Sequence, residues 1–163
     1  MSSKFTIPEM VKPVSTLVPA ADAAGRSGVA HSLKNCAKAF IVALIDQGNA
    51  ATILLTPEQC SAVAGTGAKA ISATRIWASQ DLAAASGDQL TRQTDAANFT
   101  TSAAVKNKMV VFEIDPSALD IEGGFDCIRL TTGASNVANI TSAMLLLVPL
   151  RYGQATPPSS RVD

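Results

Sequence analysis

The segment Leu44–Thr56, LIDQGNAATILLT, places two apolar runs on either side of the polar break Asp46-Gln47-Gly48-Asn49. Gly and Asn accept the positive φ angles of a tight turn, so the segment can form a β-hairpin. The competing interpretation is a strand followed by the Gly-containing loop with which nucleotide-binding folds begin. That fold needs a helix of about a dozen residues after the loop, whereas Asn49 is followed by the strand-like run AATILLT. We therefore expect a hairpin.

Elsewhere, short runs rich in Val, Ile and Thr alternate with turn residues, and no long stretch has helical spacing. This pattern predicts an all-β protein, an antiparallel jelly-roll-like β-sandwich with eight or nine strands. The predicted strands are Val14–Val18, Ala30–Leu33, Ala39–Ile45, Ala51–Thr56, Ala70–Ala78, Leu90–Phe99, Lys108–Ile114, Phe125–Thr131 and Ile140–Tyr152.

Two strands are too apolar for the simple alternation of a strand with one solvated face. These are MVVFEI, which begins at Met109, and AMLLLV, which begins at Ala143. Both are typical of central strands, or of strands with both faces covered.

The spacing also fits two short helical turns. In TPEQCSAVAG, Thr56 suits an N-cap and Pro57 the first helical position, although a strand continuing through this segment competes with the helix. In DPSALD, Asp115 precedes Pro116, which favours a single turn.

Residues 1–13 contain two prolines and no periodicity, which predicts an extended N-terminal arm. Residues 153–163, GQATPPSSRVD, are rich in Pro and Ser and predict a C-terminal tail. Residues 14–152 then form one domain, long enough for a substantial core.

Charge is balanced and scarce. Thirteen Lys and Arg face thirteen Asp and Glu, and charged residues make up 16% of the chain, against about 25% in ordinary soluble domains. A DNA-binding domain carries a basic surplus, so we expect no nucleic-acid partner. Because surface charge favours solubility, so low a content suits a protein that covers much of its surface with other subunits.

Neither a membrane partner nor export is expected. The longest apolar run, Ala143–Leu150, is far shorter than the about 20 residues of a spanning helix, and the N-terminal residues lack an apolar run of signal-peptide length. In the reducing cytosol, Cys36, Cys60 and Cys127 are expected to be small buried apolar residues and not disulfides.

Candidates for catalysis are few. His31 is the single histidine, and no G-x-S-x-G motif accompanies it, so we expect a structural role. GTGAKA, Gly65–Ala70, departs from a phosphate loop because Lys69 does not follow Gly and Ala70 replaces Ser or Thr. We therefore expect the segment Gly65–Ala70 to be a loop between two strands. No C-x-x-C pair is present, so zinc is not expected.

A cluster of carboxylates occupies the segment 113–126. Paired carboxylates can hydrolyse a glycoside or bind calcium. The spacing does not fit an EF-hand loop, and aromatic residues are only 4% of the chain, whereas sugar sites rest on stacked rings. We expect solvated turn residues. The cluster consists of Glu113, Asp115, Asp120, Glu122 and Asp126.

Several phrases occur together, in order: SLKNCAKAFIVALIDQGNAATILLTPEQ, VAGTGAKAI, IWASQDLAAASGDQLTRQTDA, KMVVFEIDPSALD, GFDCIRLTTGASNVANITSA and LRYGQATPP. They resemble a family of small proteins encoded beside the major capsid gene in tailed bacteriophages, over roughly residues 30–157. These proteins look like the jelly-roll cement, or decoration, proteins of short-tailed phages. Such proteins sit on a capsid shell of HK97-like fold and clamp neighbouring capsomers as dimers or trimers.

The resemblance implies a virion protein of the capsid surface, made in the bacterial cytoplasm, with no enzymatic activity, cofactor or metal. Its partners would be the major capsid protein and further copies of itself. The contact residues would be Phe5, Ile7, Met10 and Val11 in the N-terminal arm, Arg151 and Tyr152 at the end of the domain, and Arg161 in the C-terminal tail.

Three other functions compete. One is a tail or fibre-attachment protein. Another is a carbohydrate-binding β-sandwich module, which would need a ring cluster around Trp77 or Tyr152. An enzyme would need a pocket that holds His31 or the carboxylates of the segment 113–126.

Overall fold

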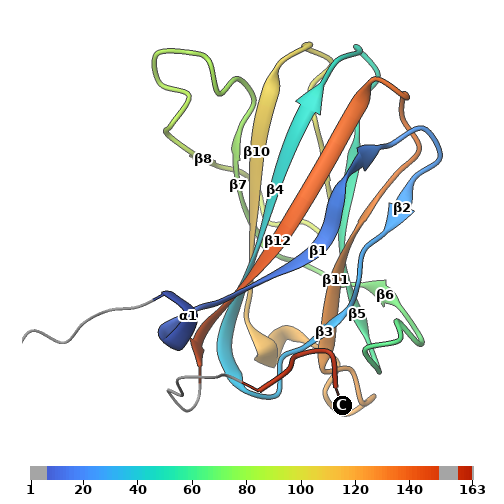
Figure 1. Cartoon of the computed structure of the whole chain (residues 1–163), viewed down its shortest axis with the longest axis vertical. Coiled ribbons are helices and arrows are strands. Elements are labelled where there is room, and N and C mark those ends of the chain that lie inside the picture. Colours follow the sequence, from blue (N-terminus) through green and yellow to red (C-terminus); the bar gives the residue numbers. More distant parts are fainter. Residues whose placement is uncertain (1–6, 151–157, 163) are drawn as a thin grey trace, which may run out of the picture.

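Two antiparallel sheets pack face to face in the computed structural model, which describes residues 7–150 and 158–162 (Figure 1). Sheet A has the strand order β1-β12-β4-β10-β7-β8, and sheet B the order β2-β11-β5-β6, with β3 against β11 and β9 against β5. The strands are β1 (Lys12–Ala21), β2 (Arg26–Ser27), β3 (His31–Ser32), β4 (Cys36–Gln47), β5 (Leu54–Cys60), β6 (Lys69–Ala70), β7 (Arg75–Ser79), β8 (Thr91–Arg92), β9 (Phe99–Thr100), β10 (Asn107–Ile114), β11 (Cys127–Thr132) and β12 (Asn139–Leu150).

The sheet order is that of a jelly roll. When β2 and β3 are counted as one interrupted strand, the main strands are β1, β2/β3, β4, β5, β6, β10, β11 and β12. Numbered one to eight in this order, the main strands lie in the order 1-8-3-6 in sheet A (β1-β12-β4-β10). In sheet B they lie in the order 2-7-4-5 (β2-β11-β5-β6). This is the arrangement of two Greek keys. The predicted fold class is confirmed, and residues 71–106 are an insertion that adds β7 and β8 to sheet A.

The described residues form twelve strands, where eight or nine were predicted. Several strands have only two residues, because the chain pairs briefly where it passes a sheet edge. The predicted strand Ala70–Ala78 divides into β6 in sheet B and β7 in sheet A. The predicted strand Leu90–Phe99 is mostly irregular and keeps β8, a bridge between Thr74 and Ala96, and the first residue of β9.

The core lies between the sheets. Along β4, alternate side chains are buried, and Ile41 and Ala43 have no exposed surface. They belong to one cluster with Leu55 and Leu130 of sheet B. A slip of one residue would turn these side chains outward, so burial fixes the register of sheet A.

The segment Leu44–Thr56 is a crossover between the sheets, and the predicted hairpin is wrong. β4 ends at Gln47 in sheet A, and β5 begins at Leu54 in sheet B. Within residues 7–150 and 158–162, positive φ angles occur only at other glycines. Gly48 is instead required by close packing, since a Cβ there would lie 2.5 Å from the carbonyl oxygen of Ala138.

A distant side chain fixes this crossover. Asn139, at the start of β12, accepts the Asn49 N–H at its Oδ1 (2.8 Å) and donates from Nδ2 to the Ala51 carbonyl (2.8 Å). Asn139 has no exposed surface. The conformation of the polar segment Asp46–Asn49 therefore depends on a residue about 90 positions away. Rules for local turns do not include such a distant contact.

Of the two expected helical turns, one forms. η1 (Pro116–Ala118) has Asp115 as its N-cap, and the carboxylate accepts the Ser117 N–H at 3.1 Å. The helix at Thr56–Gly65 does not form, because β5 continues to Cys60 and pairs with β11 along its length. Sheet pairing outweighs the local capping signal.

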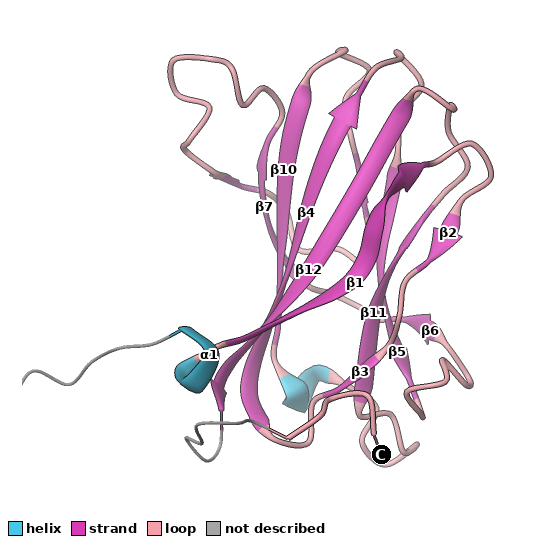
Figure 2. Cartoon of the chain, in the orientation of Figure 1, coloured by secondary structure: helices cyan, strands magenta, loops and turns pink. Residues whose placement is uncertain are grey.

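Both described ends of the chain lie at the lower end of the sandwich (Figure 2). Residues 7–10 of the predicted extended arm form the short helix α1 (Ile7–Met10), and β1 begins at Lys12, two residues before the predicted boundary at Val14. Residues 158–162 of the predicted tail return to the domain, where the Ser160 carbonyl accepts the Ser32 N–H (2.8 Å).

Candidate interaction surface

His31 holds the C-terminal segment and has the structural role that the sequence predicted. Its Nε2 lies 3.0 Å from the Ser15 carbonyl, which can only accept, so this nitrogen carries the proton. Nδ1 then accepts the Ser160 hydroxyl at 3.0 Å. His31 is 2% exposed, and burial, with smaller contributions from Arg161 and Lys12, lowers its pKa.

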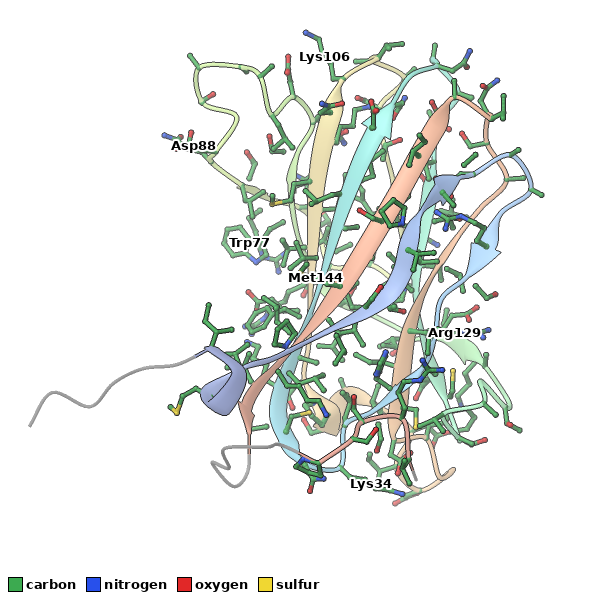
Figure 3. All side chains as sticks on the ribbon, viewed as in Figure 1. Lys34, Trp77, Asp88, Lys106, Arg129 and Met144 are labelled. Carbon is green, nitrogen blue, oxygen red and sulfur yellow. The ribbon has the colours of Figure 1, made fainter. Side chains whose placement is uncertain are left out.

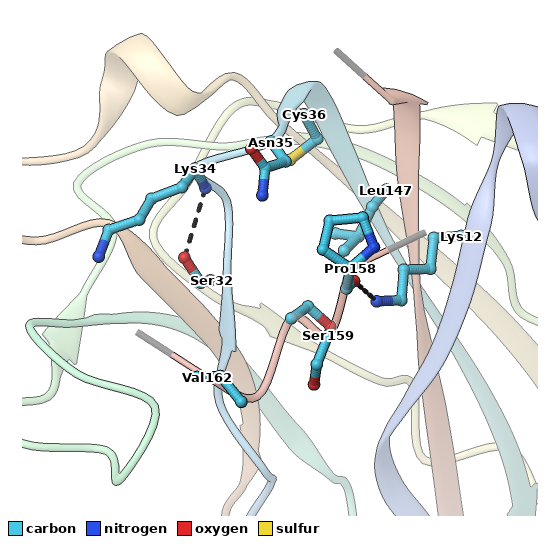
Figure 4. Close-up of a pocket in the computed structure, with 10 residues that line it drawn as sticks. Lys12, Ser32, Lys34, Asn35, Cys36, Leu147, Pro158, Ser159 and Val162 are labelled. Carbon is cyan, nitrogen blue, oxygen red and sulfur yellow. Dashed lines mark hydrogen bonds between the residues drawn. The ribbon is translucent and has the colours of Figure 1, made fainter. Parts of the chain in front are cut away.

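A histidine bonded to a serine resembles part of a hydrolytic site, but this pair lacks access. Ser160 is also buried. The adjoining cavity, between the C-terminal segment and the start of β4, measures about 40 Å³, which leaves room for little more than a water molecule (Figure 4). On its rim, Lys12 Nζ donates to the Pro158 carbonyl. The pair therefore fastens the tail and does not face a substrate.

The carboxylates of the segment 113–126 do not converge. Among residues 7–150 and 158–162, no three His, Cys, Asp or Glu side chains are grouped to hold a metal ion. Glu113 accepts from Lys38 Nζ (2.9 Å) and Trp77 Nε1 (3.0 Å), and Asp120 binds Lys69 (2.5 Å). The hydrogen bond from Lys38 is the main cause of the lowered pKa of Glu113. The hydrogen bond from Lys69 is likewise the main cause of the lowered pKa of Asp120. A general acid at neutral pH needs a raised pKa.

Residues 65–68 of the GTGAKA segment lie in the loop between β5 and β6, as predicted, whereas Lys69 and Ala70 form β6 itself. The two strands pair at Glu58 with Ala70 and at Gln59 with Lys69. Gly65 and Gly67 have positive φ angles, which explains the glycines. The Lys69 ammonium binds Asp120 and lies 4.0 Å from the centre of the Phe125 ring, so its charge is already engaged.

Lys108 is among the largest fully buried side chains in the described part of the chain. Its Nζ donates to Gln47 Oε1 (2.7 Å) and to the Ser102 carbonyl (2.6 Å), and burial lowers its pKa. Both acceptors are uncharged, and the contacts join the segment before β10 to the end of β4. We assign it a structural role.

A sugar-binding platform is not available at Trp77. Its ring nitrogen is bonded to Glu113, and the Arg92 guanidinium lies 5.6 Å from the ring centre. The other ring expected there, Tyr152, lies outside the described residues.

The predicted contact residues divide into two groups. Ile7 and Met10, on α1, are 56% and 44% exposed, and Arg161 in the C-terminal segment is also exposed, whereas Val11 is half-buried. Phe5, Arg151 and Tyr152 lie outside the residues that the structure describes.

An extensive apolar surface was not among the predicted sites. It is the side of sheet A that faces away from sheet B, and we call it the outer face (Figure 3). Leu44 and Met144 are 42% and 44% exposed there. The outer face consists of Phe40, Val42, Leu44, Trp77, Met109, Val111, Ile140, Met144, Leu146 and Val148.

Strand register makes this surface continuous. Met144 of β12 pairs with Val42 of β4, Val42 with Val111 of β10, and Val111 with Trp77 of β7. One row of apolar side chains thus crosses four strands, with Ser15 of β1 at its end. The Cβ atoms of directly opposite residues lie about 5 Å apart, so neighbouring side chains in the row can contact each other.

The outer face has a hollow on one side. It measures about 330 Å³ and lies over β1, β12 and β4, where small residues such as Ser15, Ser142 and Ala143 form its floor. Leu44 and Met144 also line it.

Charged residues border the outer face at both ends of its strands. At one end, they form ion pairs with each other within the chain. There Glu113 binds Lys38 at 2.9 Å and lies 3.9 Å from Arg75. At the other end, Asp46 lies one residue before the end of β4. Between these ends, the outward side chains of β12, β4 and β10 are uncharged.

The sequence contained a signal for this surface. MVVFEI and AMLLLV were too apolar for strands with one solvated face, and they form β10 and β12. Sheet B covers only one side of them. No element of the described part of the chain covers their second side, so the prediction that both faces are covered within the chain is not met there.

Comparisons of the chain with protein-family models, with curated proteins and with solved structures find no match. In residues 7–150 and 158–162, no helix is long and apolar enough to cross a bilayer. The geometry of the surfaces thus provides the basis for a functional proposal.

Proposed function

We propose that this protein is a structural component of a tailed-phage particle, a decoration protein that binds the outside of the major capsid protein shell and strengthens it. The observation that carries the role of a subunit in an assembly is the outer face, an apolar surface across four strands that the described chain leaves uncovered. Contiguous apolar surfaces of this kind mark interaction sites. The low charge content and the resemblance to phage proteins support the same function.

The bonding of the catalytic candidates favours a structural role over an enzymatic one. His31 fastens the tail, Lys69 is paired, and Glu113 is held by Lys38 and Trp77. Each of these three groups thus makes a bond within the fold.

For the shell contact, we propose the lower end of the sandwich. α1 presents Ile7 and Met10 to solvent there, and residues 158–162 lie at the same end (Figure 1). Contacts of modest area, repeated over a shell, would add avidity and resist internal pressure.

Cosedimentation with shells that lack the protein tests this function. We expect saturable binding at a fixed ratio to the major capsid protein. Ile7→Ser combined with Met10→Ser should weaken binding at least tenfold, because both side chains lose their apolar contact. No binding of the wild-type protein at micromolar concentration would refute the proposal.

Val105→Ser is the matched control. Val105 is 52% exposed, close to the 56% of Ile7, and lies beside Lys106 at the opposite end of the sandwich. Its binding should equal that of the wild type. Equal loss in the control would argue against the lower end as the contact.

A further inference from the structure

We infer that a second copy of this chain covers the outer face, so that two sandwiches pack sheet A against sheet A about a two-fold axis. This inference rests on the structural role proposed above. It extends that role by naming the molecule that covers the outer face. The lower end would remain free for the shell.

The first argument is area. The five strands from β1 to β7 span about 24 Å at a spacing of about 4.8 Å, and the stretch of β4 from Lys38 to Asp46 extends about 27 Å. The face therefore covers roughly 650 Å² before side-chain relief is counted. Each partner of a standard stable interface contributes about 800 Å². The outer face is thus close to the size that a stable dimer requires.

The second argument is charge. The Lys38 and Arg75 side chains already lie beside Glu113 within the chain, and the middle of the face is uncharged. A strongly charged partner would find no counter-charge in this middle region and would have to desolvate its own charges. A second apolar face has no such cost. The chain has no net charge, so two copies do not repel each other over long range.

The third argument is shape. A two-fold interface brings the same surface of both copies together. β4 is the middle strand of the five, and Val42 lies midway between Lys38 and Asp46. A two-fold axis through this centre and along the strands places the hollow over β1 and β12 opposite the larger side chains Met109, Val111 and Trp77 of the other copy. Packed sheets interdigitate in this way at a separation of about 10 Å.

Analytical ultracentrifugation of the free protein tests this inference. We expect the wild type to have twice the chain mass of 16.8 kDa at micromolar concentration. Met144→Glu should shift it to a monomer, because two copies would then bury like charges. Circular dichroism and thermal unfolding would show that the variant is folded, since Met144 is exposed in the single chain.

Val137→Glu is the control, because Val137 is 71% exposed on the connection between β11 and β12, outside the outer face. It should remain dimeric. A wild-type monomer, a trimer, or a dimer unaffected by Met144→Glu would overturn the inference.

Methionine oxidation of the wild type gives a second readout that needs no folded variant. Met10 and Met144 are both 44% exposed in the single chain. As the protein concentration rises, dimerisation should slow oxidation of Met144 by peroxide at least fivefold, with little change at Met10. Parallel rates at all concentrations would contradict the outer-face dimer.

The two proposals can fail separately. A monomer that still binds shells would overturn the dimer alone, whereas a dimer that does not bind shells would overturn the shell function alone.

Discussion

At the scale of single residues, polar side chains in this protein mainly hold distant segments together. Asn139 fixes the crossover at Asn49, and His31 joins β3 to Ser15 and Ser160. Both side chains are buried, so each hydrogen bond replaces contacts with water that folding removes. Losing one partner leaves the other unsatisfied in the interior, which costs about 1–3 kcal/mol.

His31 should give the fold a pH dependence. Burial lowers its pKa in the folded protein below the ordinary value of about 6.5. The unfolded chain then binds the proton more readily, so stability is complete above about pH 6.5 and declines as the pH falls toward the folded-state pKa. We expect the melting temperature to fall between pH 7.5 and pH 5.

His31→Gln is the control for this effect. His31 is the only histidine in the chain. The lowered pKa values of Asp81 and Glu113 lie below the interval from pH 5 to pH 7.5, and burial raises the pKa of Cys36 to about 11, above it. The variant should therefore have a nearly constant melting temperature over the same interval. An equal slope in both proteins would assign the pH dependence to other groups.

At the scale of elements, the crossover from β4 to β5 decides the topology. It carries the chain from sheet A to sheet B, where a hairpin would have kept both strands in one sheet. The crossover fits only because Gly48 approaches the Ala138 carbonyl. It therefore depends on packing against the connection before β12.

Gly48→Ala should destabilise the protein by about 1–3 kcal/mol, because the added Cβ overpacks a rigid backbone contact. Denaturant unfolding measures the change. Gly124→Ala is the comparison, because its Cβ would meet no heavy atom within 4 Å and its cost of about 1 kcal/mol arises from the positive φ alone. A smaller loss at Gly48 than at Gly124 would show that the crossover can relax.

At the scale of the whole molecule, the chain is a two-layer sandwich with one large apolar surface turned outward. Its charges are few, balanced and paired near the border of that surface. Association of such a molecule should be driven by burial of apolar area and not by charge.

Salt should therefore have little effect on dimerisation. Between 0.1 M and 1 M NaCl the screening length falls from about 10 Å to about 3 Å, which would weaken an interface held by exposed ion pairs. We expect the dissociation constant to change less than about threefold, or to decrease, because burial of apolar area is not screened. A tenfold increase, measured by sedimentation equilibrium, would show that charges drive the contact.

The sequence determined the fold class and most of the long strands. The β-branched runs, the turn residues and the absence of helical spacing required an all-β sandwich, and β4, β10 and β11 follow apolar runs that local rules detect. The capping turn at Asp115 was equally local. The same composition also indicated that surfaces would be covered by other subunits.

The tertiary structure alone decided the sheet in which each strand lies and which apolar side chains remain uncovered. Local turn signals favoured a hairpin for the segment Leu44–Thr56, and contacts with the distant residues Asn139 and Ala138 hold it as a crossover. The sequence signalled that β10 and β12 are apolar on both sides, but not that one side stays uncovered, because the apolar runs are the same whether that side meets the core or another molecule. Long-range pairing fixes both features, and it connects residues that no local pattern relates.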